Sequence, residues 1–338
     1  MSDPPLPIKS FGNRPTILWV IILVGFICLL FIGNLDPFLH EWDERFHALV
    51  ASHMMNDPFR PTLYTNPIFS YKIEDWCCNH IWLHKQPLFL WFMSISMKFF
   101  GTTIFALRLP SILLSSILPL FVFDIAHRWT ANRRFACIAA SFMAFSFYSI
   151  LLSSGTFHTD HNDAQFCVFV TGNIWAWIRY VDRPTTKRAI LIGLFCGLAI
   201  LIKWLVALLI FGVWFVIKFN KLWNQRSQRM DFIWSILTCV IIALPWQIYS
   251  AIRFPAEWKR AMDHNALHIS TVLDGHSGGP IFYLSSSTLY YGALFFLVVP
   301  LMIWFVWKEK KKPAMQWGLI LSMAVVYLFS PLSRKRKC

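Results

Sequence analysis

The sequence predicts an all-α polytopic membrane protein, and three observations carry that prediction. Of its 338 residues, 57% are hydrophobic and only 14% are charged, whereas a soluble domain carries about a quarter charged residues. Nine apolar runs have, or come close to, the length that a helix needs to cross a bilayer. The basic residues behind the net charge of +14 lie in short clusters between these runs, as in cytoplasmic loops. We therefore predict no nucleic-acid partner.

The expected spans follow one another along the whole chain, which we interpret as a single transmembrane domain over residues 1–338. They cover residues 17–33, 104–127, 135–153, 164–181, 188–202, 204–219, 231–250, 286–307 and 314–330. The first run has no small-residue cleavage site after it, which predicts a retained helix. Numbered in this order, the spans place every strong basic cluster ahead of the C-terminal tail on one side of the membrane, as the positive-inside rule requires.

One long apolar run, residues 189–217, is interrupted only by Lys203. A single helix over this run would be about 43 Å long and would separate two basic loops that belong on the same side. Two short helices with Lys203 at the turn between them avoid both problems. The sequence therefore predicts a helical hairpin that presents Lys203 on the outer side.

The outer side also receives two long loops, residues 34–103 and 251–285. The first loop holds seven of the 17 acidic residues and two segments with apolar residues at helical spacing. The second of these segments, residues 88–100, is too short to cross the roughly 30 Å hydrocarbon core. It has a polar side formed by Ser94, Ser96 and Lys98. We therefore expect it to lie along the membrane surface as an interfacial helix.

Ionisable residues inside the expected spans are few. Arg108 and Asp124 are the main examples, and both lie near span ends, where a side chain can extend to the membrane surface. A pump or a channel places such residues within its helices more often. The eight cysteines include no C-x-x-C motif and imply no disulfide framework. The chemistry of the protein is therefore expected on its outer surface.

Short motifs follow one another along nearly the whole chain. They are WDE at residues 42–44, KQPL at 85–88, ALRLPS at 106–111, TDHND at 159–163, GLA at 197–199, PW at 245–246 and HSGG at 276–279. In this order they resemble the polyprenyl-phosphate-sugar glycosyltransferases of the GT-C type, bacterial family 39, with the protein O-mannosyltransferases and the lipid A aminoarabinose transferases as relatives. The resemblance implies a GT-C-like bundle of about nine transmembrane helices, with interfacial helices in the first outer loop.

The resemblance assigns the acidic pair of the first outer loop, Asp43 and Glu44, to catalysis. The positive end of a helix keeps a carboxylate in its first turn ionised, which suits Asp43 as a general base, with Glu44 in support. For a hydroxyl acceptor, Asp43 would take the proton as the anomeric carbon is attacked. For a phosphate acceptor no base is needed, and Asp43 would orient the acceptor or offset developing positive charge. Without the resemblance, the pair is simply the acidic first turn of an interfacial helix.

Two isolated lysines on the outer side, Lys85 and Lys203, are expected to bind the donor phosphate. An ammonium is a compact point charge that can stabilise the departing polyprenyl phosphate; alternatively, each lysine only reaches the lipid headgroups. Asp160 and Asp163 share a short outer loop, where the resemblance places an acidic residue of the acceptor or donor pocket. The spacing leaves open which of the two it is, and the loop is otherwise an ordinary polar span terminus.

His84 and His264 are candidate ligands of a divalent metal such as zinc. The aminoarabinose transferases that the chain resembles are metal-dependent, with an acidic ligand just before the Lys-x-Pro motif and a histidine in a later outer loop. This chain has His84 at the first place, His264 is the nearest match to the second, and a third ligand has no counterpart. Imidazoles suit zinc, but histidines that face lipid headgroups explain the same pattern, so no cofactor is assigned.

The sequence therefore predicts a glycosyltransferase of the inner (plasma) membrane of a bacterium, active on the outer (periplasmic) face. Its partners would be a polyprenyl-phosphate sugar donor, membrane lipids, and a protein or glycolipid acceptor. Two alternatives stay open. The family normally continues through further helices beyond the segment at residues 328–335, so we expect a truncated C-terminus, which favours a non-catalytic member. The other alternative is a lipid-linked sugar transporter, although the sequence shows no inverted repeat.

Overall fold

The computed structural model describes residues 16–41, 43–66, 68, 70–73, 79–154, 161–203, 205–270, 296, 300, 304 and 314–322. Within these residues the protein is helical, apart from one isolated antiparallel bridge between Thr62 and Ile81. The helices are α1 (Thr16–Gly33), α2 (Asp43–Met54), α3 (Leu88–Phe100), α4 (Ile104–Ser115), α5 (Leu118–Thr130), α6 (Arg133–Ala144), α7 (Phe147–Ser154), α8 (His161–Asp182), α9 (Thr186–Lys203), the 3-10 helix η2 (Leu205–Leu208), α10 (Leu209–Asn224), α11 (Arg226–Arg253) and α12 (Pro255–Ser270). A further helical stretch covers residues 314–322.

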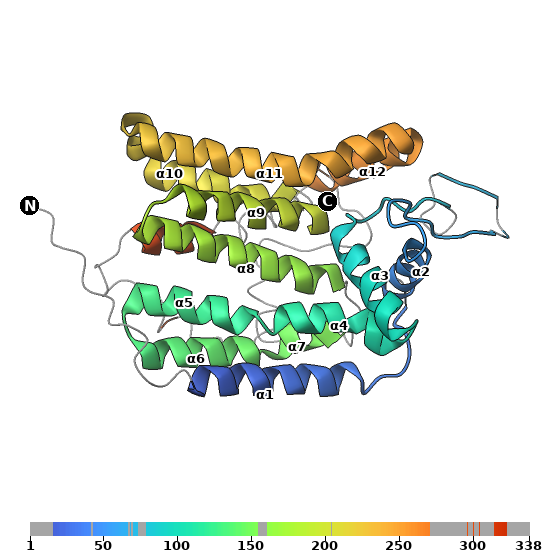
Figure 1. The fold of residues 1–338 in the computed structure, drawn as a ribbon, viewed down its shortest axis with the longest axis horizontal. Coiled ribbons are helices and arrows are strands. Elements are labelled where there is room, and N and C mark those ends of the chain that lie inside the picture. The colour runs from blue at the N-terminus through green and yellow to red at the C-terminus, as the bar shows by residue number, and fades with distance from the viewer. Residues whose placement is uncertain are drawn as a thin grey trace, which may run out of the picture.

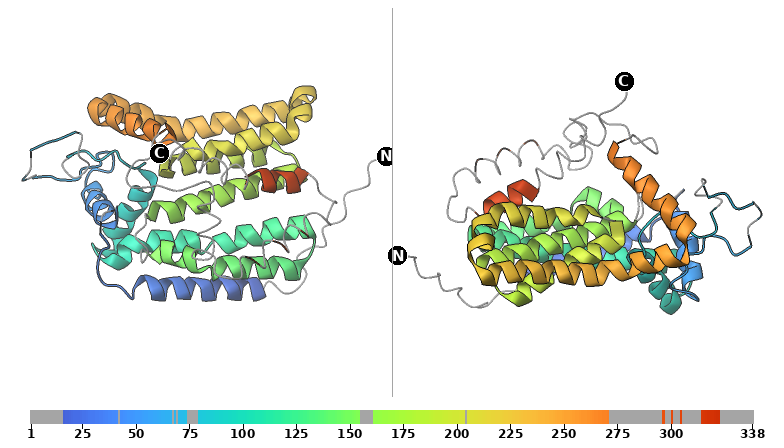
Figure 2. Two further views of the ribbon diagram at one scale, coloured as in Figure 1. Left: turned by 180° about the vertical axis from the view of Figure 1, so that it is seen from behind. Right: turned by 90° about the horizontal axis from the view of Figure 1, so that it is seen from above.

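Most of these helices lie side by side in one elongated bundle (Figure 1). Helices α1 and α4 to α11 run along its long direction, whereas α2 and α3 pack across one end (Figure 2). The largest apolar core lies between α8, α9, α10 and α11 and includes Trp177, Ile202 and Trp214. A second core beneath α2 and α3 includes Val50 and Phe89. The end helices are therefore packed onto the bundle by their own apolar faces.

Three helical segments are long and apolar enough to cross a membrane, namely Thr16–Gly33, Ile104–Thr130 and Arg226–Arg253. A fourth candidate is α6 together with α7, which bend by 47° at a short break. The protein is therefore an integral membrane protein. Helices α8, α9 and α10 occupy three more of the expected spans but do not qualify individually on length and apolar character. The expected span 286–307 lies almost wholly outside the described residues, so the number nine stays a prediction.

The two ends of the bundle differ in charge. The connections α5–α6, α8–α9 and α10–α11 lie at the same end (Figure 1), and arginine or lysine occurs in each connection or in the helix ends that flank it. Helices α2 and α3 and the connection from α9 to α10 lie at the opposite end. Helix α9 ends at Lys203, and α10 returns along the bundle. The interpretation of residues 189–217 as two helices is therefore confirmed.

Helices α9 and α11 approach each other closely because two glycines leave room for the neighbouring backbone. A Cβ on Gly193 would overlap the carbonyl oxygen of Ser235, and a Cβ on Gly197 would crowd Ile242. Small residues at such contacts are typical of helices packed within a membrane. The close contact stabilises α9 along its length and so fixes the position of Lys203 at its last turn.

The polar residues of helix α3 do not share one exposed face. Ser94 and Ser96 are buried against the protein, whereas Ile95 and Phe99 are exposed and Lys98 is exposed as expected. The two small serines pack against neighbouring elements and so do not form an exposed polar side with Lys98. The expectation that this helix lies along the membrane surface stays a prediction. In the expected later outer loop, residues 255–270 form helix α12.

Candidate active site

Helix starts and caps gather polar side chains at the end of the bundle that α2 and α3 cover. Helix α2 begins with Asp43 and Glu44, and acidic residues are stabilised in the first turn of a helix. Helix α3 is followed by Gly101, whose positive φ of 80° suits glycine. The Thr103 side chain then accepts the N–H of Ala106 and caps α4. This turn directs α4, which carries Arg108, back along the bundle.

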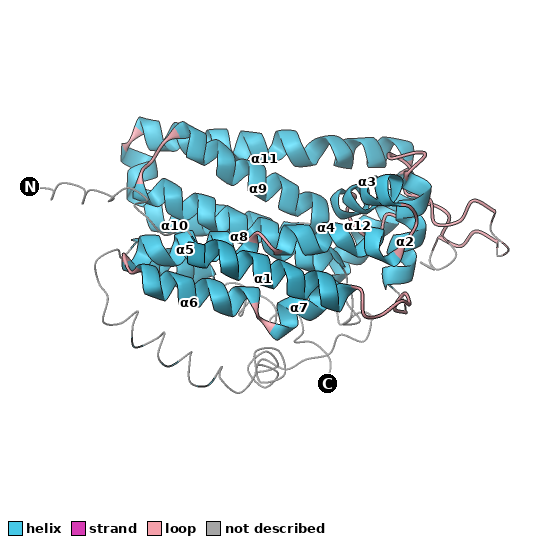
Figure 3. Ribbon diagram, turned by 60° about the horizontal axis from the view of Figure 1, so that its bottom comes forward, coloured by secondary structure: helices cyan, strands magenta, loops and turns pink. Residues whose placement is uncertain are grey.

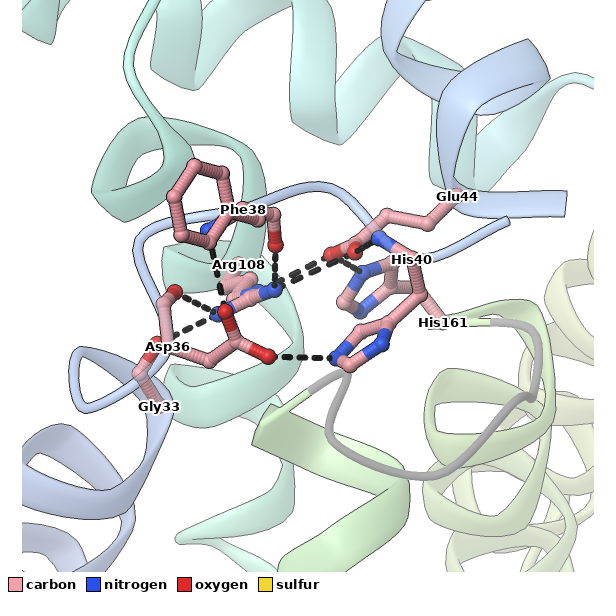
Figure 4. Close-up of polar contacts among 7 residues, drawn as sticks. All are labelled: Gly33, Asp36, Phe38, His40, Glu44, Arg108 and His161. Carbon is pink, nitrogen blue, oxygen red and sulfur yellow. Dashed lines mark hydrogen bonds and ion pairs between the residues drawn. The ribbon is translucent and has the colours of Figure 1, made fainter. Parts of the chain in front are cut away.

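Glu44 lies in a buried cluster with Arg108 of α4 and His161 of α8 (Figure 4). Its Oε1 and Oε2 atoms accept hydrogen bonds from Arg108 Nε at 2.9 Å and Nη2 at 3.1 Å. His161 Nε2 lies 2.9 Å from Oε1, and the backbone N–H of His40 donates to Oε2 at 2.7 Å. Since Glu44 is only 3% exposed, its two carboxylate oxygens are surrounded by protein donors.

The electrostatics of this cluster keep Glu44 ionised. Burial alone raises the pKa of a carboxyl group, but the hydrogen bonds from His161 and Arg108 outweigh burial and lower the pKa of Glu44 from 4.5 to about 2. Hydrogen bonds to an ionised partner are among the strongest in proteins. A carboxylate with such a low pKa is a poor general base, because it holds a proton weakly.

Arg108 uses all five of its N–H donors. Besides its bonds to Glu44, it donates through Nη1 to the carbonyl oxygens of Gly33 at 2.9 Å and Asp36 at 2.8 Å, and through Nη2 to that of Phe38 at 3.0 Å. We expected Arg108 to reach the membrane surface, but it is fully buried, so that expectation was wrong. Burial of the guanidinium is tolerated because every donor is paired. This one side chain fixes the connection from α1 to α2.

Asp43, the neighbour of Glu44 in the sequence, has a more open environment. Its side chain is 35% exposed, and its Oδ2 lies 3.9 Å from Nζ of Lys85, which is 19% exposed. Lys85 lies just ahead of α3, so the two residues come from opposite ends of the first outer loop. At 3.9 Å the two groups form an ion pair but are too far apart for a direct hydrogen bond.

A second carboxylate–lysine pair lies at the same end of the bundle. Nζ of Lys203, the last residue of α9, donates to Oδ1 of Asp163 in the first turn of α8. The two side chains are 45% and 30% exposed. Of the two acids between which the sequence could not decide, Asp163 thus contacts a predicted phosphate-binding lysine. Asp160 lies outside the described residues.

His84 and His264 lie near each other, with their ring centroids 5.8 Å apart. Among the described residues, no group of three or more histidine, cysteine, aspartate or glutamate side chains is placed to hold a metal ion. Two imidazoles fall short of the three protein ligands of a catalytic zinc site and the four of a structural one. The predicted pair is therefore adjacent, but the described residues do not fit a complete zinc site.

Comparisons with known proteins give the fold and sequence a context. A family model described as dolichyl-phosphate-mannose-protein mannosyltransferase matches residues 84–249. Undecaprenyl phosphate-alpha-4-amino-4-deoxy-L-arabinose arabinosyl transferase 2 of Proteus mirabilis is 22% identical over 96% of this chain and 56% of its own length. Transferase 1 of the same description from Pseudomonas fluorescens is 25% identical over 77% of this chain and 47% of its own length.

Solved structures agree with these matches. ArnT from Cupriavidus metallidurans bound to undecaprenyl phosphate superposes with a TM-score of 0.69 and 16% identity, covering 96% of this chain and 57% of ArnT. In sequence and fold the chain is therefore similar to the GT-C glycosyltransferases. The archaeal oligosaccharyltransferase AglB from Archaeoglobus fulgidus, in complex with an inhibitory peptide and a dolichol-phosphate, gives a TM-score of 0.61 at 13% identity, covering 94% of this chain and 49% of AglB.

The chain spans about half the length of the curated relatives it matches. The part matched by the family model includes Lys85, Arg108, Asp163 and Lys203. Asp43 and Glu44 lie ahead of the part matched by the family model. The match to the Proteus mirabilis relative is longer and extends over 96% of the chain. The similarity of fold therefore extends across the site, whereas the role proposed for each residue rests on geometry.

Contacts between segments more than 100 residues apart were not predicted from the sequence. His161 binds Glu44, Gln247 Nε2 donates to Gln86 Oε1 at 2.6 Å, and the Tyr71 hydroxyl donates to Glu257 Oε1 at 2.7 Å. The last two join the first outer loop to α11 and α12. His161 and Gln86 fall within the motifs TDHND and KQPL. The motifs marked the positions, but no local pattern gives partners more than 100 residues away.

Proposed function

We propose that the protein transfers a sugar from a polyprenyl-phosphate-linked donor to an acceptor on the outer, periplasmic face of a bacterial inner membrane. The acceptor is a protein or a glycolipid. The observation that supports this proposal is the gathering of two carboxylate–lysine pairs, Asp43–Lys85 and Asp163–Lys203, at one end of a GT-C bundle. The opposite end carries the basic connections expected in the cytoplasm. A full set of about nine membrane spans belongs to the same proposal.

Asp43 is the reactive member of the first-loop acidic pair. It is one-third exposed and lies 3.9 Å from the ammonium of Lys85, whereas Glu44 is buried and bound by four donors. With a hydroxyl acceptor, the acceptor oxygen forms a bond to the anomeric carbon and its proton passes to Asp43. The bond between the anomeric carbon and the phosphate oxygen breaks, and its electron pair leaves with the polyprenyl phosphate. With a phosphate acceptor, Asp43 orients the acceptor and takes no proton.

Lys85 and Lys203 stabilise the leaving group. A sugar phosphodiester carries one negative charge, and the polyprenyl phosphate that departs carries more. Cations at the phosphate therefore bind the transition state more strongly than the ground state, and only such a difference accelerates the reaction. Each lysine already lies beside a carboxylate, so binding of the phosphate moves each ammonium from Asp43 or Asp163 toward the donor. Asp163, and Asp160 of the same TDHND motif, contribute to the pocket.

Transfer of label from a radiolabelled polyprenyl-phosphate sugar, in membranes that contain the protein, tests this function. Asp43→Asn should lower transfer to a hydroxyl acceptor by about 10²–10⁴-fold, the usual contribution of a general base, while membrane insertion is unchanged. Asp57→Asn is the matched control, because Asp57 is an exposed acid of the same loop, just after α2. It should transfer as the unaltered protein does.

The possible outcomes separate the proposal from its rivals. Full transfer by the Asp43→Asn variant would remove this residue from the mechanism. No transfer by the unaltered protein, once its insertion is shown, would contradict the enzymatic function and favour a family member that binds the lipid without transferring its sugar.

A further inference from the structure

His161 connects two parts of the proposed site that lie far apart in the sequence. It is the first residue of α8, its side chain is fully buried, and its Nε2 lies 2.9 Å from Oε1 of Glu44 in α2 (Figure 4). Two residues after it comes Asp163, and one residue before Glu44 comes Asp43. The contact between His161 and Glu44 thus joins the start of α2, which carries Asp43, to the start of α8, which carries Asp163.

The direction of this hydrogen bond follows from the charge of Glu44. An ionised carboxylate can only accept hydrogen bonds, and Glu44 is ionised at neutral pH. Nε2 of His161 therefore carries the hydrogen and donates it. The Nδ1 atom of the same ring is buried and has no hydrogen-bond partner among the described residues. The orientation of this imidazole is therefore set through Nε2.

Arg108 does not replace this contact. Its five donors bind Glu44 and the backbone between Gly33 and Phe38, and none of those bonds reaches α8. Arg108 consequently fixes α2 to α4 and to the end of α1. The hydrogen bond between Glu44 and His161 then connects α2 to α8.

We propose that His161 is a positioning residue, which holds the start of α8 against the start of α2 so that the pairs Asp43–Lys85 and Asp163–Lys203 act on one donor phosphate. This inference rests on the proposed function. His161 touches neither donor nor acceptor in this account and acts through Glu44. Because an error of about 1 Å in the placement of reacting groups can lower the rate about 10²-fold, loss of the contact should affect turnover more than donor binding.

Two substitutions of the same residue test the inference by activity. In His161→Leu the donor from α8 to Glu44 is lost while those from Arg108 and His40 remain, and kcat should fall about 10–100-fold while KM for the donor changes less than about threefold. In His161→Gln the side-chain amide can donate to the same oxygen, and kcat should recover most of the loss. Equal losses in both variants, or a change confined to KM, would overturn the inference.

A matched control separates positioning from a general loss of stability. Ser153 of α7 donates to Ser115 Oγ of α4 at 2.7 Å, so Ser153→Ala also removes a buried hydrogen bond between two helices. Thermal unfolding in detergent should show a loss of stability in Ser153→Ala similar to that in His161→Leu, with kcat retained. If both variants lose kcat in proportion to stability, His161 has no positioning role.

A distance measurement tests the same inference without catalysis. Spin labels at Arg45→Cys in α2 and at the exposed natural Cys167 in α8, with the other cysteines replaced, report the separation of the two helix starts. His161→Leu should broaden the distance distribution, and His161→Gln should leave it narrow. An unchanged distribution in His161→Leu would overturn the inference. If the unaltered protein transfers no sugar but His161→Leu still broadens the distance distribution, the proposed function is refuted and the connection between α2 and α8 is supported.

Discussion

Two neighbouring acids, Asp43 and Glu44, begin the same helix and have opposite environments. Glu44 is buried, is bound by Arg108, His161 and the backbone of His40, and has a pKa of about 2. Asp43 is one-third exposed and lies 3.9 Å from one lysine. The comparison teaches that burial with complete pairing makes a carboxylate a structural anchor, whereas partial exposure with a loose partner leaves it available for chemistry.

The largest effect on stability is expected from breaking the buried cluster. Arg108→Met leaves the charge of Glu44 buried with fewer partners and deprives three backbone carbonyls of their donor. Removal of one partner of a buried ion pair costs about 3–5 kcal/mol, and denaturant unfolding in detergent should show a loss of that size. An Arg108→Met variant as stable as the unaltered protein would show that the buried cluster is not an anchor.

Acid should weaken the same anchor at a defined pH. The pKa of Glu44 is lowered from 4.5 to about 2 in the folded protein. Its contribution to stability is therefore fully present above about pH 4.5 and is lost as the pH falls toward 2, on the order of 3 kcal/mol in total. The unfolding temperature of the unaltered protein should decline over this range more steeply than that of Glu44→Gln. Parallel declines would show that Glu44 does not titrate as described.

The open pairs should respond to ligand more than to unfolding. Lys203→Ala removes a partly exposed cation, and binding of polyprenyl phosphate should weaken about tenfold, or about 1.4 kcal/mol, with little change in unfolding temperature. Titration of the purified protein with this lipid measures the effect. Unaltered affinity would mean that Lys203 only pairs with Asp163.

The smallest effect is expected at an ion pair on α12, where neither residue is buried. Lys259 Nζ lies 2.9 Å from Asp263 Oδ2, and the side chains are 76% and 57% exposed. Exposed pairs of this spacing contribute less than about 0.5 kcal/mol, so Lys259→Ala should unfold almost as the unaltered protein does. A loss above about 1 kcal/mol would weaken the argument that burial decides the strength of these pairs.

The sequence indicated the residues of the open pairs, although not their pairing, better than those of the buried cluster. Lys203 was placed on the same side as Asp163 by the distribution of basic loops, which depends on membrane topology and needs no side-chain detail. The burial of Glu44 depends on Arg108, 64 residues away, and on His161, 117 residues away. No local pattern records such distant partners, so both the low pKa of Glu44 and the burial of Arg108 required the structure.

The orientation of helix α3 could not be predicted from its sequence, for a different physical reason. Its serines suggested a polar outer side, as they would on a helix in water. The structure buries Ser94 and Ser96 and exposes Ile95 and Phe99. Lipid tails are as apolar as leucine, so apolar side chains that face lipid gain nothing from burial in the protein. The polarity of a helix face therefore does not indicate whether that face is buried. The existence and length of the helix were predictable, but its orientation was not.

The central claim is that Asp43 acts in transfer and Glu44 in structure. The most direct test measures sugar transfer and thermal unfolding in parallel for Asp43→Asn and Glu44→Gln, each an isosteric change that removes one charge. We predict that Asp43→Asn loses transfer about 10²–10⁴-fold with its unfolding temperature retained, and that Glu44→Gln unfolds at a clearly lower temperature. Normal transfer by Asp43→Asn, or full stability of Glu44→Gln, would contradict the account.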